Sequence, residues 1–151
     1  MKKIVVIFCL ICWVFLAVKV EGADLYLRMN IVVESPINWA QIQKIKEMPE
    51  ETNFRPGHKI VCVLVFHPVA DDKMVKIEWV GPYGKIEQAY THAISASEKE
   101  AGGEYAVHSW LSIDGSFSDK VLGNKFAGAW RVKASINGKQ IVRKEFTIYH
   151  D

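Results

Sequence analysis

Histidines are the residues of this chain that could ligate a metal ion or move a proton near neutral pH. The five are His58, His67, His92, His108 and His150. None lies in an HExxH motif, and no pair of cysteines joins them beyond residue 22. His92 and His108 would share a site only if the strands that carry them pair. We therefore interpret the histidines as scattered surface residues and predict no metal ion and no other cofactor.

Residues for nucleophilic or acid–base catalysis are present without a catalytic arrangement. Ser116 lacks the second glycine of a G-x-S-x-G turn, and no helical pattern follows it. Two acidic clusters, at residues 71–72 and 98–100, lie in polar segments where burial would not shift a carboxyl pKa. The turn 81–84 holds a proline where a phosphate-binding loop needs a backbone donor. We therefore predict no catalytic residues and a protein that is not an enzyme.

Aromatic side chains on two alternating segments are the remaining candidates. His108 and Trp110 lie opposite the apolar face of segment 104–113, and Tyr90 and His92 share one face of the preceding segment. If these two strands pair, the four side chains form one aromatic patch of the kind that binds a protein or a glycan. In the alternative interpretation they pack under the long connection 114–127. Tyr90, His92, His108 and Trp110 are therefore our candidate partner-binding residues.

The first 22 residues have the pattern of a secretory signal peptide. Lys2 and Lys3 precede an apolar run over residues 4–18, and Val20 and Gly22 supply the small side chains of a cleavage site. A transmembrane anchor is the alternative, but the run has 15 residues where about 20 are needed to cross a bilayer. We predict a cleaved signal peptide at 1–22 and one domain at 23–151. The mature protein would then be secreted or periplasmic, without stable membrane insertion.

The chain that remains after cleavage is electrically neutral. Removing the charged residues of the signal segment from 19 basic and 17 acidic residues leaves 16 of each; those removed are Lys2, Lys3, Lys19 and Glu21. Binding to nucleic acid needs clustered Lys and Arg side chains that neutralise phosphates. The longest local excess here is a pair such as Arg143-Lys144. We therefore predict neither a nucleic-acid partner nor electrostatic attachment to a membrane.

Apolar and polar residues alternate with a period of two over most of the mature chain, which indicates half-buried β-strands. The predicted strands of this kind are 25–33, 74–80, 85–94 and 104–113. Segment 59–66 is apolar on both faces, which predicts a central strand covered on both sides and an inert, buried Cys62. Residues 130–148 alternate around Asn137-Gly138, a strong type I′ turn signal, and predict a terminal β-hairpin.

One segment has helical rather than strand spacing. Trp39, Ile42 and Ile45 recur every three residues after Asn38, a potential helix cap, so we expect a short helix near 38–47. Residues 47–57 contain two prolines and are expected to form a loop. The outer side chains of the central strand, Val61, Val63 and Val65, are either covered by the helical segment or form an interface. Coverage is the favoured interpretation.

About seven short strands, turns every 8 to 12 residues and one helix predict an antiparallel β-sandwich, with a small lipocalin-type barrel as the alternative. Cys62 and Trp79 are spaced somewhat like the cysteine and tryptophan of immunoglobulin domains, although the second cysteine has no counterpart. The chain more closely resembles bacterial exported immunoglobulin-like domains of uncharacterised function. The matching pieces between residues 54 and 148 are Pro56-Gly57, Trp79 with Pro82 and Gly84, residues 128–132, Asn137-Gly138 and residues 146–148. This resemblance implies an immunoglobulin-like fold and export.

The leading functional hypothesis is an exported, non-enzymatic binding module that contacts a protein or glycan through loops and the aromatic face. The second is a small carrier whose cavity, lined in part by Tyr90, Trp110 and Phe126, holds an apolar molecule. A hydrolase with an unrecognised site is third. Fold alone does not decide among these hypotheses, because one sandwich architecture serves many functions.

Overall fold

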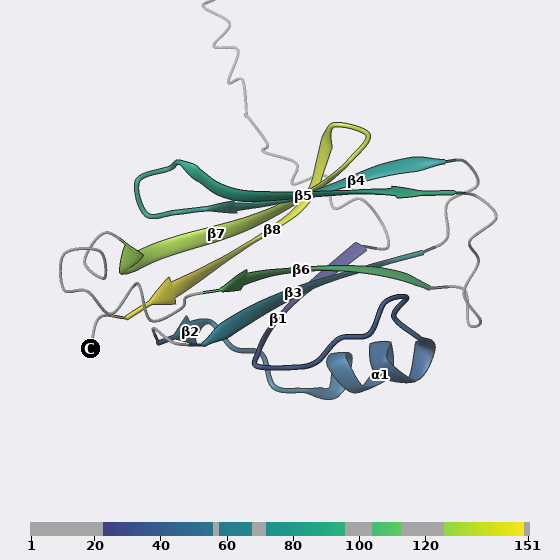
Figure 1. The fold of residues 1–151 in the computed structure, drawn as a ribbon, viewed down its shortest axis with the longest axis horizontal. Coiled ribbons are helices and arrows are strands. Elements are labelled where there is room, and N and C mark those ends of the chain that lie inside the picture. The colour runs from purple at the N-terminus through teal and green to yellow at the C-terminus, as the bar shows by residue number, and fades with distance from the viewer. Residues whose placement is uncertain (1–22, 56–57, 68–71, 96–103, 113–125, 150–151) are drawn as a thin grey trace, which may run out of the picture.

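The computed structural model describes residues 23–55, 58–67, 72–95, 104–112 and 126–149. In these residues eight strands and one helix follow one another (Figure 1). In order they are β1 (Ala23–Met29), α1 (Trp39–Glu47), β2 (Asn53–Phe54), β3 (Lys59–Phe66), β4 (Lys73–Val80), β5 (Ile86–Ile94), β6 (Tyr105–Ser112), β7 (Gly128–Ile136) and β8 (Lys139–Ile148). The predicted signal segment 1–22, Pro56-Gly57 and most of the connection 114–127 lie outside the described residues. No helix in the described part of the chain is both long and apolar enough to span a bilayer.

The strands form two separate sheets that pack face to face. One sheet has three strands in the order β1-β3-β6, and the other has five in the order β2-β8-β7-β4-β5. All pairs are antiparallel except β2 with β8, which is parallel. The predicted all-β sandwich with a single short helix is confirmed. The described residues form eight strands where about seven were predicted. The additional strand is β2, which lies within the segment predicted as a loop and adds two residues to the edge of the larger sheet.

Inward-facing side chains of both sheets make the core. Trp79, Trp130 and Phe146 are its centre: the Phe146 ring lies 5.9 Å edge-on from that of Trp79 and 6.1 Å from that of Trp130. Cys62 is fully buried, and burial raises the pKa of its thiol. The thiol therefore stays protonated at neutral pH. The Trp79 indole nitrogen donates a 2.9 Å hydrogen bond to the buried hydroxyl of Ser109, which ties β4 of one sheet to β6 of the other.

Helix α1 covers the outer face of the three-stranded sheet (Figure 1). It begins where predicted, because the Asn38 side chain accepts a hydrogen bond from the Gln41 backbone and the Gln41 side chain accepts one from the Asn38 backbone. Its buried side chains, Ile42 and Ile45, pack in the same cluster as Val61, Val63 and Val65. The three valines are therefore covered.

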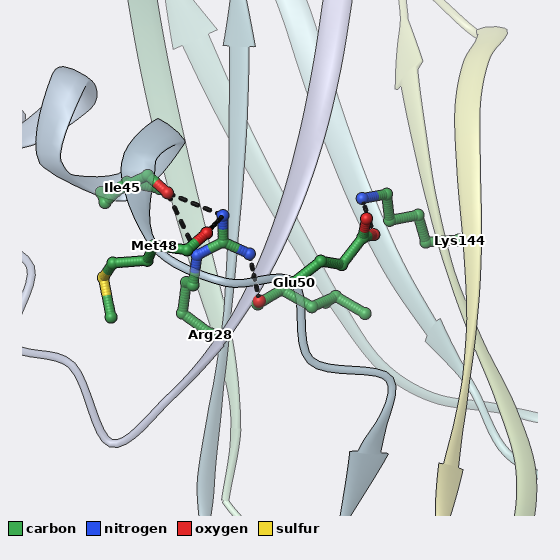
Figure 2. A network of polar contacts seen from close by, with 6 residues as sticks. Arg28, Ile45, Met48, Glu50 and Lys144 are labelled. Carbon is green, nitrogen blue, oxygen red and sulfur yellow. Dashed lines mark hydrogen bonds and ion pairs between the residues drawn. The ribbon is translucent and has the colours of Figure 1, made fainter.

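A buried arginine fastens the end of this helix to the sheet. Arg28, on the outer face of β1, is only 2% exposed. Its guanidinium donates hydrogen bonds to the carbonyl oxygens of Ile45 (2.7 and 3.1 Å) and Met48 (2.9 Å), as Figure 2 shows. These carbonyls belong to the last turn of α1, which lacks intrahelical donors. Glu50 continues the chain beyond this point and pairs with Lys144 of β8.

The structure corrects one strand boundary. The strand predicted over 25–33 ends at Met29, because Asn30 adopts a left-handed backbone with φ of 51°. Its side-chain oxygen accepts a hydrogen bond from the Lys59 backbone and its own backbone donates one back to Lys59, so the turn is held on both sides. Residues 31–33 therefore leave the sheet edge and run across its outer face. The terminal hairpin is confirmed, with positive φ at Asn137 and Gly138.

Candidate functional site

The four predicted site residues form two pairs in two different sheets. β5 pairs with β4 and β6 pairs with β3, so the pairing of β5 with β6 that a single patch requires does not occur. His108 and Trp110 lie on the outer face of the three-stranded sheet, opposite Val63 and Val61. Tyr90 and His92 lie on the inner face of β5, opposite the buried Ile77 and Val75, at the margin of the larger sheet. The single aromatic patch is therefore replaced by two separate pairs.

The first pair sits at the end of the outer face that α1 leaves uncovered. Along β6 the outward side chains become more exposed, from Ala106 at 8% through the half-buried His108 to Trp110 at 43%. The His108 and Trp110 rings are stacked, with centroids 5.8 Å apart. The Lys59 ammonium lies 4.6 Å from the centre of the Trp110 ring, within the range of a cation–π interaction.

These side chains line an open pocket of about 220 Å³. Trp110, His108 and Lys59 supply its polar and aromatic walls, and the remaining lining is aliphatic: Ile31, Val33 and Val61. The aliphatic residues come from β3 and from segment 31–33, which is on this face only because the strand ends at Met29. Such a site combines an apolar floor with a few directed polar groups, which is the usual composition of a small-ligand pocket.

Among the described residues, the charge that borders the pocket is the ammonium of Lys59. Burial is the main cause that lowers the pKa of His108 below its ordinary value of 6.5, and the charges of Lys59 and His92 lower it further. The imidazole is therefore neutral at pH 7 and can donate or accept a hydrogen bond. Within the described residues, no hydrogen bond or ion pair engages the Lys59 ammonium. A negatively charged group entering the pocket would find a cation that no carboxylate of the described residues engages.

Two hydrogen bonds between the sheets fix the part of β6 that carries this site. Ser109 accepts a bond from Trp79, and the backbone carbonyl of Trp110 accepts a 2.9 Å bond from the side chain of Gln88 on β5. Because adjacent residues of β6 are both tied to the opposite sheet, the Trp110 backbone is held while its ring stays exposed. The sequence predicted the outward direction of His108 and Trp110, but it did not identify Lys59 or Gln88 as their neighbours.

A second pocket on the same outer face was not predicted. It has a volume of about 270 Å³ and lies between α1 and segment 31–33; its lining is Ile31, Val32, Gln41, Lys44, Ile45 and Met48. Val32 is 89% exposed beside it, and Ile31 lines both pockets. Hydrophobicity alone could not reveal this pocket, because segment 31–33 continued the alternation of a strand.

The second aromatic pair packs against the core instead of lining a pocket with Trp110. The Tyr90 and His92 rings are stacked with centroids 6.2 Å apart and an interplanar angle of 9°. Phe126, the third residue expected to line a carrier cavity, stacks on Trp130 at 6.2 Å. Tyr90, Trp110 and Phe126 therefore do not surround one cavity. Within the residues that the structure describes, no three His, Cys, Asp or Glu side chains gather as metal ligands.

Comparison with known proteins finds likenesses among solved structures only. No family model matches it, and neither does any curated protein sequence. Similar solved structures include an alkylpurine DNA glycosylase from Pseudomonas fluorescens (14% identity, TM-score 0.44), a β-glucosidase from Listeria innocua (12%, 0.46) and an immunoglobulin-like protein from Pseudomonas aeruginosa (11%, 0.40), each matched over 85% of this chain. The chain spans 31% of the glycosylase and 16% of the glucosidase. It spans 98% of the immunoglobulin-like protein.

Proposed function

We propose that this protein is an exported, non-enzymatic binding module that holds a glycan in the pocket formed by Lys59, His108 and Trp110. The observation that carries the proposal is the position of Trp110. Its ring is 43% exposed, borders a pocket, and lies beside a neutral imidazole and a cation. An aromatic ring offers a sugar an apolar surface, and the neighbouring polar groups provide hydrogen bonds that orient it.

Lys59 indicates the kind of sugar. Its ammonium has no carboxylate partner among the described residues, and the pKa of His108 is lowered by positive neighbours and by burial. The site therefore favours a glycan that bears a carboxylate or sulfate group, which would pair with Lys59 while the sugar ring stacks on Trp110. Export rests on the sequence pattern of residues 1–22, and the same pattern supports a secreted or periplasmic location.

A glycan array read with three forms of residues 23–151 tests the pocket. Wild type should retain acidic glycans, and Trp110→Ala should lose at least about tenfold in affinity, the loss of roughly 1.4 kcal/mol of binding free energy. Trp39→Ala is the matched control, because Trp39 is 49% exposed and lies outside the pocket. Equal binding by the Trp110 and Trp39 variants, or binding only to a protein partner, would refute the glycan proposal. N-terminal sequencing of the exported protein tests cleavage before Ala23.

A small apolar ligand is the second candidate, and the pocket beside α1 favours it. Most of that lining is aliphatic: Ile31, Val32, Ile45 and Met48. Substituting the exposed Val32 by Glu would weaken binding of an apolar fluorescent probe there, whereas Trp110→Ala would leave it unchanged. If Val32→Glu binds the probe as wild type does, this pocket is not a carrier site.

A further inference from the structure

The four sheet edges differ in how they are closed to other strands. Exposed strand edges can pair with strands of other molecules, and proteins normally protect them with short strands, charges, proline or bulges. The β2 edge is only two residues long. Beside β1, the Glu50–Lys144 pair and the Arg28 network occupy the margin (Figure 2). On β6, the carbonyl of Trp110 is already bonded to Gln88. The β2 edge is therefore short, and the margins of β1 and β6 each contact another element.

The β5 edge lacks such protection over most of its length. A register irregularity between Trp79 and Val80 disturbs its first residues, but Gln88 to Ile94 pairs regularly with β4. This seven-residue stretch contains no charged residue and no proline. Its backbone hydrogen bonds in the described structure go to β4, because β5 is the last strand of its sheet. Within the described residues no strand pairs with the opposite side of β5, which presents a row of backbone donors and acceptors.

We propose that a second copy of this chain pairs antiparallel on β5, with a two-fold axis at Thr91. This register places Tyr90 opposite the other copy's His92, and Ala89 opposite its Ala93. Each residue pair then lies on one face, so the stacked Tyr90–His92 rings of both copies form one continuous row on the inner side. On the outer side only small groups, Ala89, Thr91 and Ala93, meet across the axis.

A second copy fits this edge better than an unrelated strand because the stretch complements itself. An axis at Thr91 uses only the regular residues 88–94, whereas an axis at Tyr90 would bring the irregular start of β5 into the pairing. Two-fold pairing is also closed: each copy uses its β5 edge, so no third copy can add through the same edge. An interface of one strand pair is small, so the dimer forms reversibly and its population depends on concentration.

Analytical ultracentrifugation of residues 23–151 over a concentration series tests the proposal. Wild type should shift from monomer to dimer, and Thr91→Glu should weaken the dimer roughly tenfold or more, because two like charges face each other at the axis. The monomer tolerates this change, since Thr91 is exposed and its β4 neighbour is Lys76. Ala129→Glu is the control: it adds the same charge to the outer face of the same sheet, on the interior strand β7, and should dimerise as wild type does.

A charge-swap mixture distinguishes this register from any other association. Thr91→Lys should also be monomeric alone, and mixing it with Thr91→Glu should restore a heterodimer, because only an axis at residue 91 places these two side chains opposite each other. Wild type that stays monomeric at every concentration overturns the proposal. Thr91→Glu that dimerises normally, a mixture that stays monomeric, or open-ended oligomers in place of a dimer also overturn it. Circular dichroism confirms that each variant is folded.

Discussion

The outer faces of the two sheets have opposite character. On the three-stranded sheet this face is aliphatic, with Val61, Val63 and Val65 buried under α1. On the five-stranded sheet it carries charged side chains such as Lys76 and Arg131, which are exposed. An aliphatic face must be shielded from water. The helix and the loop that shield this face leave gaps at their borders. Both pockets lie at the borders of that cover, so the covering of one face is also what creates the candidate binding sites.

The largest expected loss of stability comes from opening a cavity between α1 and β3. Ile42→Ala should lower the free energy of unfolding by about 3 kcal/mol, because Ile42 is fully buried against the valines of β3. Met74→Ala on the bare face, where Met74 is 47% exposed, should cost less than about 0.5 kcal/mol. Urea unfolding of both variants measures the difference, and equal losses would contradict the contrast between the two faces.

The hydrogen bonds from Arg28 to the end of α1 should contribute somewhat less to the free energy of unfolding than the Ile42 side chain does. Arg28→Met keeps much of the side-chain volume but leaves the carbonyls of Ile45 and Met48 without their donor, so we expect a loss of about 2 kcal/mol. Arg131→Met is the matched change on the exposed face and should be nearly neutral. Urea unfolding of both arginine variants measures the two losses. A neutral Arg28→Met would mean that the buried guanidinium contributes no net stability.

Trp110 and Trp130 sharpen the comparison between the candidate site and the core. Trp110→Ala should cost about 1 kcal/mol or less, because the ring is 43% exposed, whereas Trp130→Ala should cost about 3 kcal/mol or more from the core. Acrylamide quenching checks the same distinction: the difference between wild type and Trp110→Phe gives the emission of Trp110, because Trp39, which is 49% exposed, contributes equally to both forms. A protected Trp110, or a large loss of stability on its removal, would make it a packing residue.

The smallest expected effect is that of His108 on the pH dependence of stability. Burial lowers the pKa of His108 in the folded protein below 6.5, so the unfolded chain binds a proton more readily. The contribution of His108 to stability is therefore complete above pH 6.5 and falls as the pH drops toward the folded pKa. Thermal unfolding at pH 7 and pH 5 should show a smaller decline for His108→Gln than for wild type. An identical decline would mean that His108 is not shielded from solvent protons.

Local signals predicted the elements that local chemistry determines. Asn38 capped the helix, Asn137-Gly138 made the hairpin turn, and the doubly apolar segment 59–66 became the covered central strand. The end of β1 was mispredicted because it depends on Asn30 bonding to Lys59, a contact between residues 29 positions apart. Arg28 lies on the polar face of this alternating segment, yet the structure buries it beneath the helix end.

The candidate site was predictable only in part, for the same reason. Alternation along one strand shows that His108 and Trp110 point away from the core. It does not show which strand lies beside them, and Lys59 joins Trp110 through the register of β3 with β6. Likewise, the separation of Tyr90 and His92 from the other pair follows from which sheet each strand joins. That choice is made by contacts between distant segments and leaves no short-range signal.

Arg28 has a consequence for the order in which the structure can assemble. Its guanidinium is buried on β1 and donates one hydrogen bond to the adjacent Leu27 carbonyl, but the other accepting carbonyls lie 17 and 20 residues later. Docking of α1 over β1 is what buries the Arg28 cation, and the helix end that removes it from water also supplies the Ile45 and Met48 carbonyls as its acceptors, whereas an α1 docked without β1 would lack these donors. The strand and the helix therefore add to the sandwich in one cooperative step. In native-state hydrogen exchange, their backbone amides should open together with one shared free energy.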